Sequence, residues 1–158
     1  HPKLKDRVEN FTKLAETYLP SGEKKEAEYA AKVDRLRIES LESELSFGRY
    51  KHVVALLSDE RVHHRYPTTL HYYLGEAYRR RGEKDDAEMA INELNKAIEL
   101  VPAYAPTYRS KGMLLMSQGK NDDAIKEFKR YLELVPDAKD KSYISDYIES
   151  LSKQKTQI

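Results

Sequence analysis

Two stretches of this chain repeat one another, and the repetition constrains the fold more than any other feature of the sequence. Residues 82–102 read GEKDDAEMAINELNKAIELVP, and residues 119–136 read GKNDDAIKEFKRYLELVP. Both run from a Gly through Asp-Asp-Ala to Leu-Val-Pro, and the first stretch carries three extra residues. Self-similarity of this kind is typical of arrays in which each unit is one supersecondary element that packs on its neighbours.

The similarity extends upstream of both stretches. When the copies are aligned on their Leu-Val-Pro ends, the three extra residues fall between Gly82 and Ala90. Because the register holds on both sides of this insertion, we expect the extra residues to start the second helix of the first copy about one turn early. The paired positions are Gly75 with Gly112, Gly82 with Gly119, Ala90 with Ala124, Leu94 with Phe128, Ala97 with Tyr131, and Pro102 with Pro136.

Each copy has the pattern of two short helices joined by a tight turn. Apolar residues recur at helical spacing on both sides of Gly82 and of Gly119,. Glycine commonly ends a helix and proline stops one. We therefore expect the first helix of each copy to end at Gly82 or Gly119 and the second to stop before Pro102 or Pro136.

Two further positions predict how the hairpins pack and begin. A glycine in the middle of a helix costs about 1 kcal/mol relative to alanine, so Gly75 and Gly112 indicate the close approach of a neighbouring helix. Asp85 and Asp122 stand just before or within the start of the second helices. Their carboxylates are placed to accept the free amide N–H groups there.

This pattern resembles the tetratricopeptide repeat (TPR), a helical hairpin of 34 residues. Lys111 and Tyr131 depart from the TPR pattern, which has Leu and a small residue at those places. The resemblance implies an all-α, right-handed solenoid of helical hairpins. The positions that carry it are His71, Leu74, Gly75, Tyr78, Gly82, Ala90, Leu94, Ala97 and Pro102 in one copy, and Tyr108, Gly112, Leu115, Gly119, Ala124, Phe128 and Pro136 in the other.

The resemblance also predicts how the chain is divided. A weaker copy precedes the two clear ones with Gly48 at its turn, and an uninterrupted helix of about 25 residues is expected between Gly22 and Phe47,. The expected segments are 1–33 for an N-terminal helical segment that follows an upstream domain absent from this chain, 34–67 for a degenerate TPR, 68–104 for a TPR with a three-residue insertion, 105–138 for a TPR, and 139–158 for a capping helix and tail.

The last of these segments has the pattern of a capping helix. Five apolar residues fall on one stripe, and Ser, Asp, Glu and Lys occupy the opposite side. A solenoid needs such a helix at its end, with one apolar and one polar face. The stripe consists of Tyr143, Ile144, Tyr147, Ile148 and Leu151.

The opening residues HPKLKDRV carry a second resemblance. His1-Pro2, four residues and then Arg7-Val8 are similar to the segment that closes the catalytic domain in HtpX- and BepA-like zinc metallopeptidases. BepA-like members carry a TPR array directly afterwards. The resemblance implies that this chain is the C-terminal TPR region of such a protein, in the bacterial periplasm or envelope. The alternative is a free-standing TPR adaptor of a bacterial envelope or secretion assembly, and a cytoplasmic location stays open.

Composition and motifs argue against several other functions. The 28 basic and 27 acidic residues give a net charge of +1, which is not the basic excess of a nucleic-acid binder,. There is no Cys, no HExxH and no apolar run of about 18 residues, so neither a metal site nor membrane insertion is expected,. His63 and His64 are expected in a solvated loop, and His71 between packed helices. We expect no catalytic residue and no cofactor in this chain, with zinc only in the absent upstream domain.

A partner-binding surface is the remaining expectation. The TPR resemblance implies that the first helices of the repeats line a concave groove for a protein or peptide ligand. The Lys and Asn residues of the carboxylate clamp that binds chaperone tails are replaced by Tyr72 and Glu76, so that ligand class is not expected. As alternatives, Met113 and Met116 belong to the core, and Arg79-Arg80-Arg81 is a solvated helix end. The predicted partner-binding residues are Thr69, Tyr72, Glu76, Arg79, Arg109, Met113 and Met116.

Overall fold

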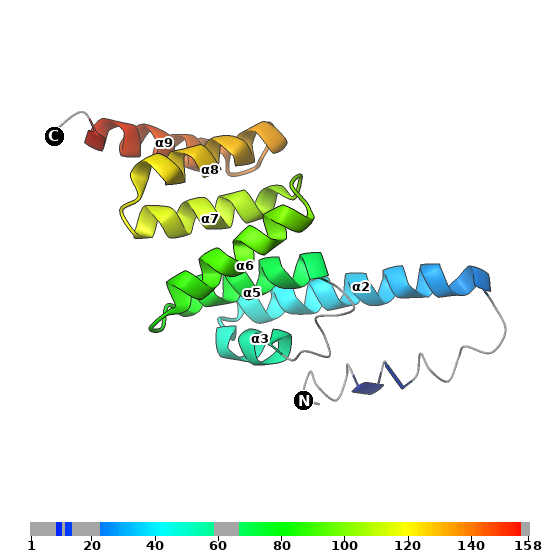
Figure 1. Ribbon diagram of the computed structural model, residues 1–158. Helices are drawn as coiled ribbons and strands as arrows, with labels where there is room; N and C mark the ends of the chain where they lie inside the picture. Colours follow the sequence, from blue (N-terminus) through cyan, green and yellow to red (C-terminus); the bar gives the residue numbers. More distant parts are fainter. Residues whose placement is uncertain (1–8, 11, 14–22, 59–66, 156–158) are drawn as a thin grey trace. The chain divides into compact units, whose positions relative to one another are not determined.

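The computed structural model describes residues 9–10, 12–13, 23–58 and 67–155, and within these ranges it contains helices and no strand (Figure 1). The chain divides into two compact units, His1–Phe47 and Gly48–Ile158. The helices are α2 (Glu23–Ser46), α3 (Tyr50–Leu57), α5 (Pro67–Arg81), α6 (Asp86–Leu100), α7 (Ala105–Ser117), α8 (Asn121–Leu134) and α9 (Lys141–Lys155).

The described part of the first unit is dominated by the single helix α2, which is 24 residues long. It matches the uninterrupted helix predicted between Gly22 and Phe47. Residues 1–22 of the predicted N-terminal helical segment lie largely outside the described residues. The boundary between the units falls after Phe47, inside the predicted degenerate repeat. The bounds of that repeat, like those of the other segments, stay a prediction.

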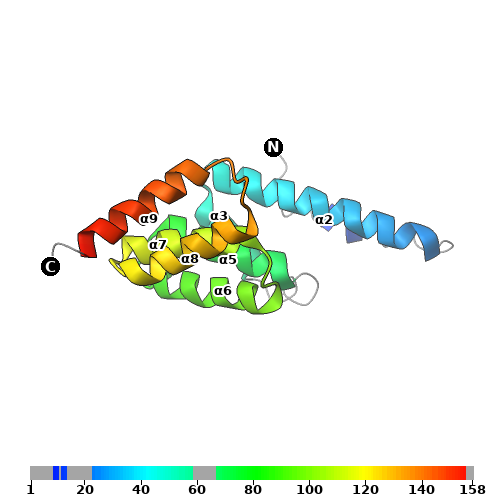
Figure 2. The ribbon, with the colours of Figure 1, turned by 90° about the horizontal axis from the view of Figure 1, so that it is seen from above.

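The second unit is a stack of helical hairpins. Helices α5 and α6 pack against each other, as do α7 and α8, and α6 contacts α7 where the two hairpins meet. Helix α3 packs on α5 at one end of this unit, and α9 packs on α8 at the other. Figure 1 shows α5 to α9 stacked in chain order, and Figure 2 shows the same helices from above. The all-α solenoid predicted from the sequence is confirmed.

The predicted turns and stops are present. Gly82 and Gly119 have φ angles of 66° and 71°, which place both in the left-handed region favoured by glycine at helix ends,. Helix α6 ends at Leu100 and α8 at Leu134, each two residues before its proline,. The copies therefore share one hairpin geometry.

The three-residue insertion is distributed differently from the prediction. Relative to the other hairpin, α5 ends one residue later, the turn after it is one residue longer, and α6 begins one residue earlier. The prediction that the second helix starts about one turn early is wrong. Sharing the extra length among helix, turn and helix keeps Gly75 opposite Ala90 and Leu94.

Both mid-helix glycines allow close packing, as predicted. A Cβ atom at Gly75 would lie 2.8 Å from Leu94 Cγ, and one at Gly112 would lie 2.6 Å from Phe128 Cδ1. Phe128 and Leu94 are fully buried. In each hairpin a large side chain of the second helix therefore packs directly against the backbone of the first helix at its glycine.

The described residues of the second unit include two clusters of buried apolar side chains. The larger cluster joins the last hairpin to α9, and the smaller one lies where α6 meets α7. The larger consists of Ala105, Tyr108, Leu115, Ala124, Phe128, Tyr131, Ile144 and Leu151. The smaller consists of Ala90, Leu94 and Leu114.

The capping stripe of α9 is confirmed except at one position. Ile144 and Leu151 are buried, and Tyr147 and Ile148 are partly buried against the core. Tyr143 is 66% exposed and does not belong to the packed face. It stands one residue before Ile144, about 100° around the helix, which carries its side chain away from α8.

The prediction that Asp85 caps α6 through its side chain is also wrong. Asp85 has a left-handed φ of 67° and makes no side-chain capping hydrogen bond. The next residue, Asp86, is 2% exposed, and its Oδ2 accepts the backbone N–H of Glu83 at 2.8 Å. In the other hairpin Lys120 occupies the N-cap position and Asp122 lies in the first turn of α8. In each hairpin an aspartate in the first turn of the second helix, Asp86 or Asp122, still places a carboxylate near the positive end of that helix,.

Candidate protein-interaction surface

The residues predicted to bind a partner lie along two helices that contact each other, α5 and α7. We call the surface they define the α5–α7 face. Spacings of three and four residues place them in one stripe on each helix. The side chain of Thr69 is outside the described part of the structure. The stripe on α5 comprises Thr69, Tyr72, Glu76 and Arg79, and that on α7 comprises Arg109, Met113 and Met116.

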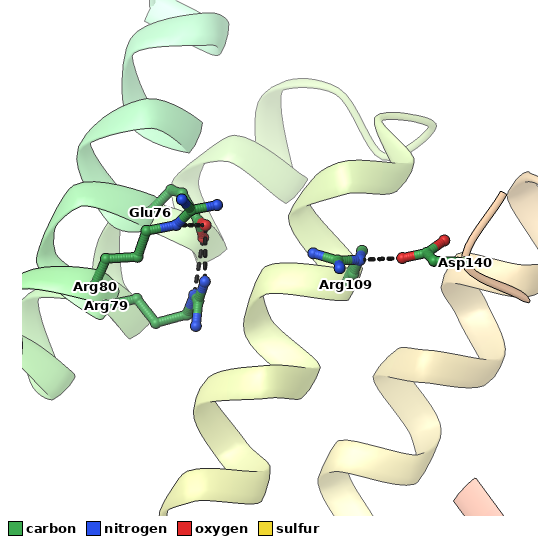
Figure 3. A network of polar contacts seen from close by, with 5 residues as sticks. All are labelled: Glu76, Arg79, Arg80, Arg109 and Asp140. Atoms are coloured by element: carbon green, nitrogen blue, oxygen red, sulfur yellow. Dashed lines mark hydrogen bonds and ion pairs between the residues drawn. The ribbon is translucent and has the colours of Figure 1, made fainter. Parts of the chain in front are cut away.

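A buried carboxylate with two arginines stands at the centre of α5. Glu76 is 1% exposed. Arg79 donates to both of its oxygens, from Nε and from Nη2, at 2.8 Å each, and Arg80 Nε donates to Oε1 at 2.5 Å (Figure 3). Burial alone would raise the pKa of Glu76, but the hydrogen bonds and charges of the two arginines hold that pKa below its usual value,. The group is therefore a charged carboxylate at neutral pH.

A polar contact joins this cluster to α7. The buried side chain of Ser110 on α7 lies close to Tyr72 and Glu76 and acts to lower the pKa of both. The ring of Tyr72 meets those of Tyr73 and Tyr104 edge-on, with centroids 5.0 and 5.2 Å apart. Burial is the main cause that raises the pKa of Tyr72 to about 12. Tyr72 and Glu76 thus hold α5 against α7 as well as belonging to the predicted surface.

The arginine run is not the solvated helix end that the sequence left open. Arg79 and Arg80 share Glu76, whereas Arg81 turns to Asp86 and donates from Nε and Nη2 at 2.8 and 2.6 Å. Hydrogen bonding from Arg81 is the main cause that lowers the pKa of Asp86. Sequence reasoning missed these pairs, although the spacing of Glu76 from the first two arginines, three and four residues along a helix, was the signal for them.

Arg109 is tied to the turn before α9. Its Nε donates to Asp140 Oδ2 at 2.5 Å, and the hydroxyl of Tyr131 donates to Asp140 Oδ1 at 2.7 Å. Burial acts to raise the pKa of Asp140, but these donors outweigh it and lower that pKa. Tyr131 departs from the TPR pattern, and its hydroxyl here links α8 to the residue before α9. Arg109 therefore has a structural contact in addition to its predicted role in binding.

The other departure from the TPR pattern is also a polar link. Lys111 Nζ lies 2.8 Å from Glu127 Oε1, which joins α7 to α8. In the preceding hairpin the residue paired with Glu127 is Glu93, and its Oε2 lies 2.5 Å from His71 Nδ1. His71 is thus packed between helices as expected, and each hairpin has a Glu at the same place in its second helix that contacts a His or Lys side chain of its first helix.

The two methionines of the α5–α7 face are partly buried. Both Met113 and Met116 pack against the larger core cluster. This position fits the alternative that they are core residues, and it leaves part of each side chain accessible. Their role in binding stays a prediction.

Within the described ranges, no group of three or more His, Cys, Asp and Glu side chains could hold a metal ion. No helix in those same ranges is long and apolar enough to cross a membrane.

Four carboxylates with lowered pKa values make the stability of the fold sensitive to acid: Glu76, Asp86, Glu93 and Asp140. Because each folded-state pKa lies below its unfolded value of about 4, their stabilising effect is complete above about pH 5 and is lost progressively as the pH falls below about 4 toward the folded-state pKa values,. We expect the urea midpoint, followed by circular dichroism, to drop between ~pH 5 and ~pH 3. A Glu76→Gln variant should lose less over the same range. A midpoint that holds steady down to ~pH 3 would contradict this.

The geometry defines the class of fold. Each hairpin has a left-handed glycine at its turn, a glycine in the middle of its first helix and a proline after its second helix. These hairpins stack into a helical-repeat solenoid. Residues 105–137 match the sequence profile of the tetratricopeptide repeat. The chain therefore contains a tetratricopeptide repeat, and its fold is that of a TPR domain.

Solved structures are similar to this chain in the same way. The first TPR of Spaghetti (RPAP3) bound to the HSP90 peptide SRMEEVD has a TM-score of 0.63 and 20% identity, over 77% of this chain and 92% of that one. The first TPR domain of the human RPAP3 protein has a TM-score of 0.58 and 21% identity, over 73% and 92%. No curated protein sequence matches the chain.

Proposed function

We propose that this chain is a protein-interaction module that binds a peptide or a segment of a partner polypeptide on the α5–α7 face. The observation that carries the proposal is the TPR fold, which is shared with a TPR domain solved with a peptide bound. The face offers Tyr, Arg and Met side chains, which are residue types enriched at protein interfaces.

The ligand of that neighbouring structure is not carried over to this chain. Tyr72 and Glu76 occupy the places where the carboxylate clamp for chaperone tails has Lys and Asn. Glu76 is a buried carboxylate held by two arginines. A negative charge there disfavours a ligand carboxylate in the clamp position. We infer that an acidic tail bound in the manner of the clamp is not the partner.

The methionines offer a test of this function, because the chain has three of them and only two lie on the face. A dodecapeptide would be selected on the 158-residue chain from a phage-displayed random library, labelled with fluorescein and titrated by fluorescence anisotropy. The double change Met113→Gln and Met116→Gln should weaken its binding about tenfold, because two adaptable apolar contacts become polar.

Met89→Gln is the matched control. Met89 lies on α6 and is half-exposed, so its replacement should leave affinity unchanged. Melting curves for all variants separate loss of folding from loss of binding. If no peptide is enriched, or if the double variant stays folded and binds as tightly as the wild type, the proposed function fails.

We further propose that the chain is the C-terminal TPR region of a zinc metallopeptidase of the bacterial periplasm or envelope. The support is the His-Pro-x4-Arg segment of residues 1–8, which lies outside the described residues. The alternative is a free-standing TPR adaptor of a bacterial envelope or secretion assembly. Sequencing the source gene upstream decides between them. An HExxH motif with zinc in the purified full-length protein supports the first, and an open reading frame without that motif supports the second.

A further inference from the structure

The cluster at the centre of α5 holds more positive than negative charge. Arg79 and Arg80 together carry two positive charges, and Glu76 carries one negative charge, so the cluster has an excess of one positive charge. Nearby on α7, Arg109 is neutralised by Asp140. Figure 3 shows Arg79 and Arg80 reaching from α5 toward α7, with Arg109 between this cluster and Asp140. The uncompensated charge of these five residues therefore sits on the two neighbouring arginines of α5.

Arg79 and Arg80 are held in place by Glu76, but their guanidinium groups still have hydrogen-bond donors available. Arg79 donates hydrogen bonds to Glu76 from Nε and Nη2, and its Nη1 has no partner among the described residues. Arg80 donates a hydrogen bond to Glu76 from Nε and also contacts Tyr50 of α3. Their side chains remain 22% and 37% exposed. Two guanidinium groups held from behind by a buried carboxylate would lose little side-chain freedom on binding an anion.

We propose that Arg79 and Arg80 bind one carboxylate of an acidic segment in a partner protein, with Glu76 as the positioning residue that orients both guanidinium groups. This inference rests on the proposed function of the α5–α7 face. Guanidinium groups match the planar carboxylate and donate charge-assisted hydrogen bonds to it. The excess of one positive charge is balanced by one carboxylate, whereas a phosphate group carries nearly twice that charge at neutral pH. The assignment differs from a clamp of Lys and Asn, whose positions this chain fills with Tyr72 and Glu76.

The test uses the selected dodecapeptide and the intact chain. Each Asp or Glu of the peptide would be replaced in turn by Asn or Gln, and affinities would be measured by fluorescence anisotropy. We expect one such replacement to weaken binding about tenfold, which is the loss expected for a hydrogen bond between charged groups. Raising NaCl from ~50 mM to ~500 mM should weaken the acidic peptide more than its neutral counterpart.

A protein variant then identifies the arginines. Arg79→Gln should remove the discrimination between the acidic peptide and its neutral counterpart, which a merely structural role would not do. Arg130→Gln is the matched control, because Arg130 lies on α8 and pairs there with Glu133, so the discrimination should persist. If Arg79→Gln does not fold, Arg80→Gln replaces it, because the more exposed side chain leaves the packing less disturbed.

The outcomes separate the inference from the function on which it rests. Peptides that depend on the two methionines of the face but tolerate every acid-to-amide replacement would overturn the inference and leave the proposed function standing. A persistent discrimination in folded Arg79→Gln and Arg80→Gln variants would also overturn it. A peptide whose affinity rises about tenfold when its acidic residue becomes phosphoserine would reassign the cluster to a phosphate ligand.

Discussion

A Gly112→Leu variant is expected to lose about 3 kcal/mol or more of its free energy of unfolding. The first added atom, Cβ, would already lie 2.6 Å from two ring carbons of Phe128. Phe128 is fully buried and stacks on Tyr147 of α9, with ring centroids 6.0 Å apart. The ring therefore has no free space to move into, and α7 must separate from α8. Urea denaturation followed by circular dichroism measures the loss.

Ser145→Leu provides the matched control, because it adds a leucine to an exposed position of helix α9. We expect that change to alter the unfolding free energy by less than about 0.5 kcal/mol. If Gly112→Leu is as mild as this control, then α7 and α8 do not approach each other at Gly112 and the alignment of the repeats is wrong.

A Glu76→Gln variant is expected to lose about 3 kcal/mol, the lower end of the range for breaking a buried ion pair. The amide keeps the shape of the side chain but removes the charge that holds both arginines. Arg79 and Arg80 retain partial access to water, which limits the loss. The same urea denaturation experiment measures it.

Glu88→Gln is the control for this prediction. Glu88 lies in the first turn of α6 and is exposed, so we expect its replacement to change stability by only a few tenths of a kcal/mol,. Equal stability of the Glu76→Gln variant and the wild type would mean that the cluster contributes nothing to the fold. The arginines would then need another explanation for their fixed positions.

The parts of the fold that depend on backbone geometry could be predicted from the sequence. Gly82 and Gly119 mark left-handed turns, Gly75 and Gly112 mark close helix contacts, and the prolines mark where the second helices stop. Only glycine fits the first two kinds of place without strain or collision. Residue identity alone is therefore enough to locate them.

The parts that depend on which side chains meet could be predicted less well. The sequence placed Glu76 and Arg109 on a surface for a partner, but each also makes an internal ion pair. The sequence predicts that the side chain of Asp85 caps α6, but Asp85 makes no such hydrogen bond and the buried carboxylate is that of Asp86. The pairing of Arg109 with Asp140 spans 31 residues. Such a contact depends on how α9 follows α8, and local spacing carries no information about it.

The contact of Tyr131 and Arg109 with Asp140 makes the two clear repeats unequal as building blocks. The paired position in the preceding hairpin is Ala97, which has no hydroxyl to offer. A chain recombined with these hairpins in the opposite order would leave Asp140 beside an alanine and without its tyrosine donor. The two hairpins share one backbone geometry, but only the later one supplies Asp140 with its tyrosine donor. Engineering that shuffles or duplicates the hairpins must therefore move Asp140 together with residues 105–138.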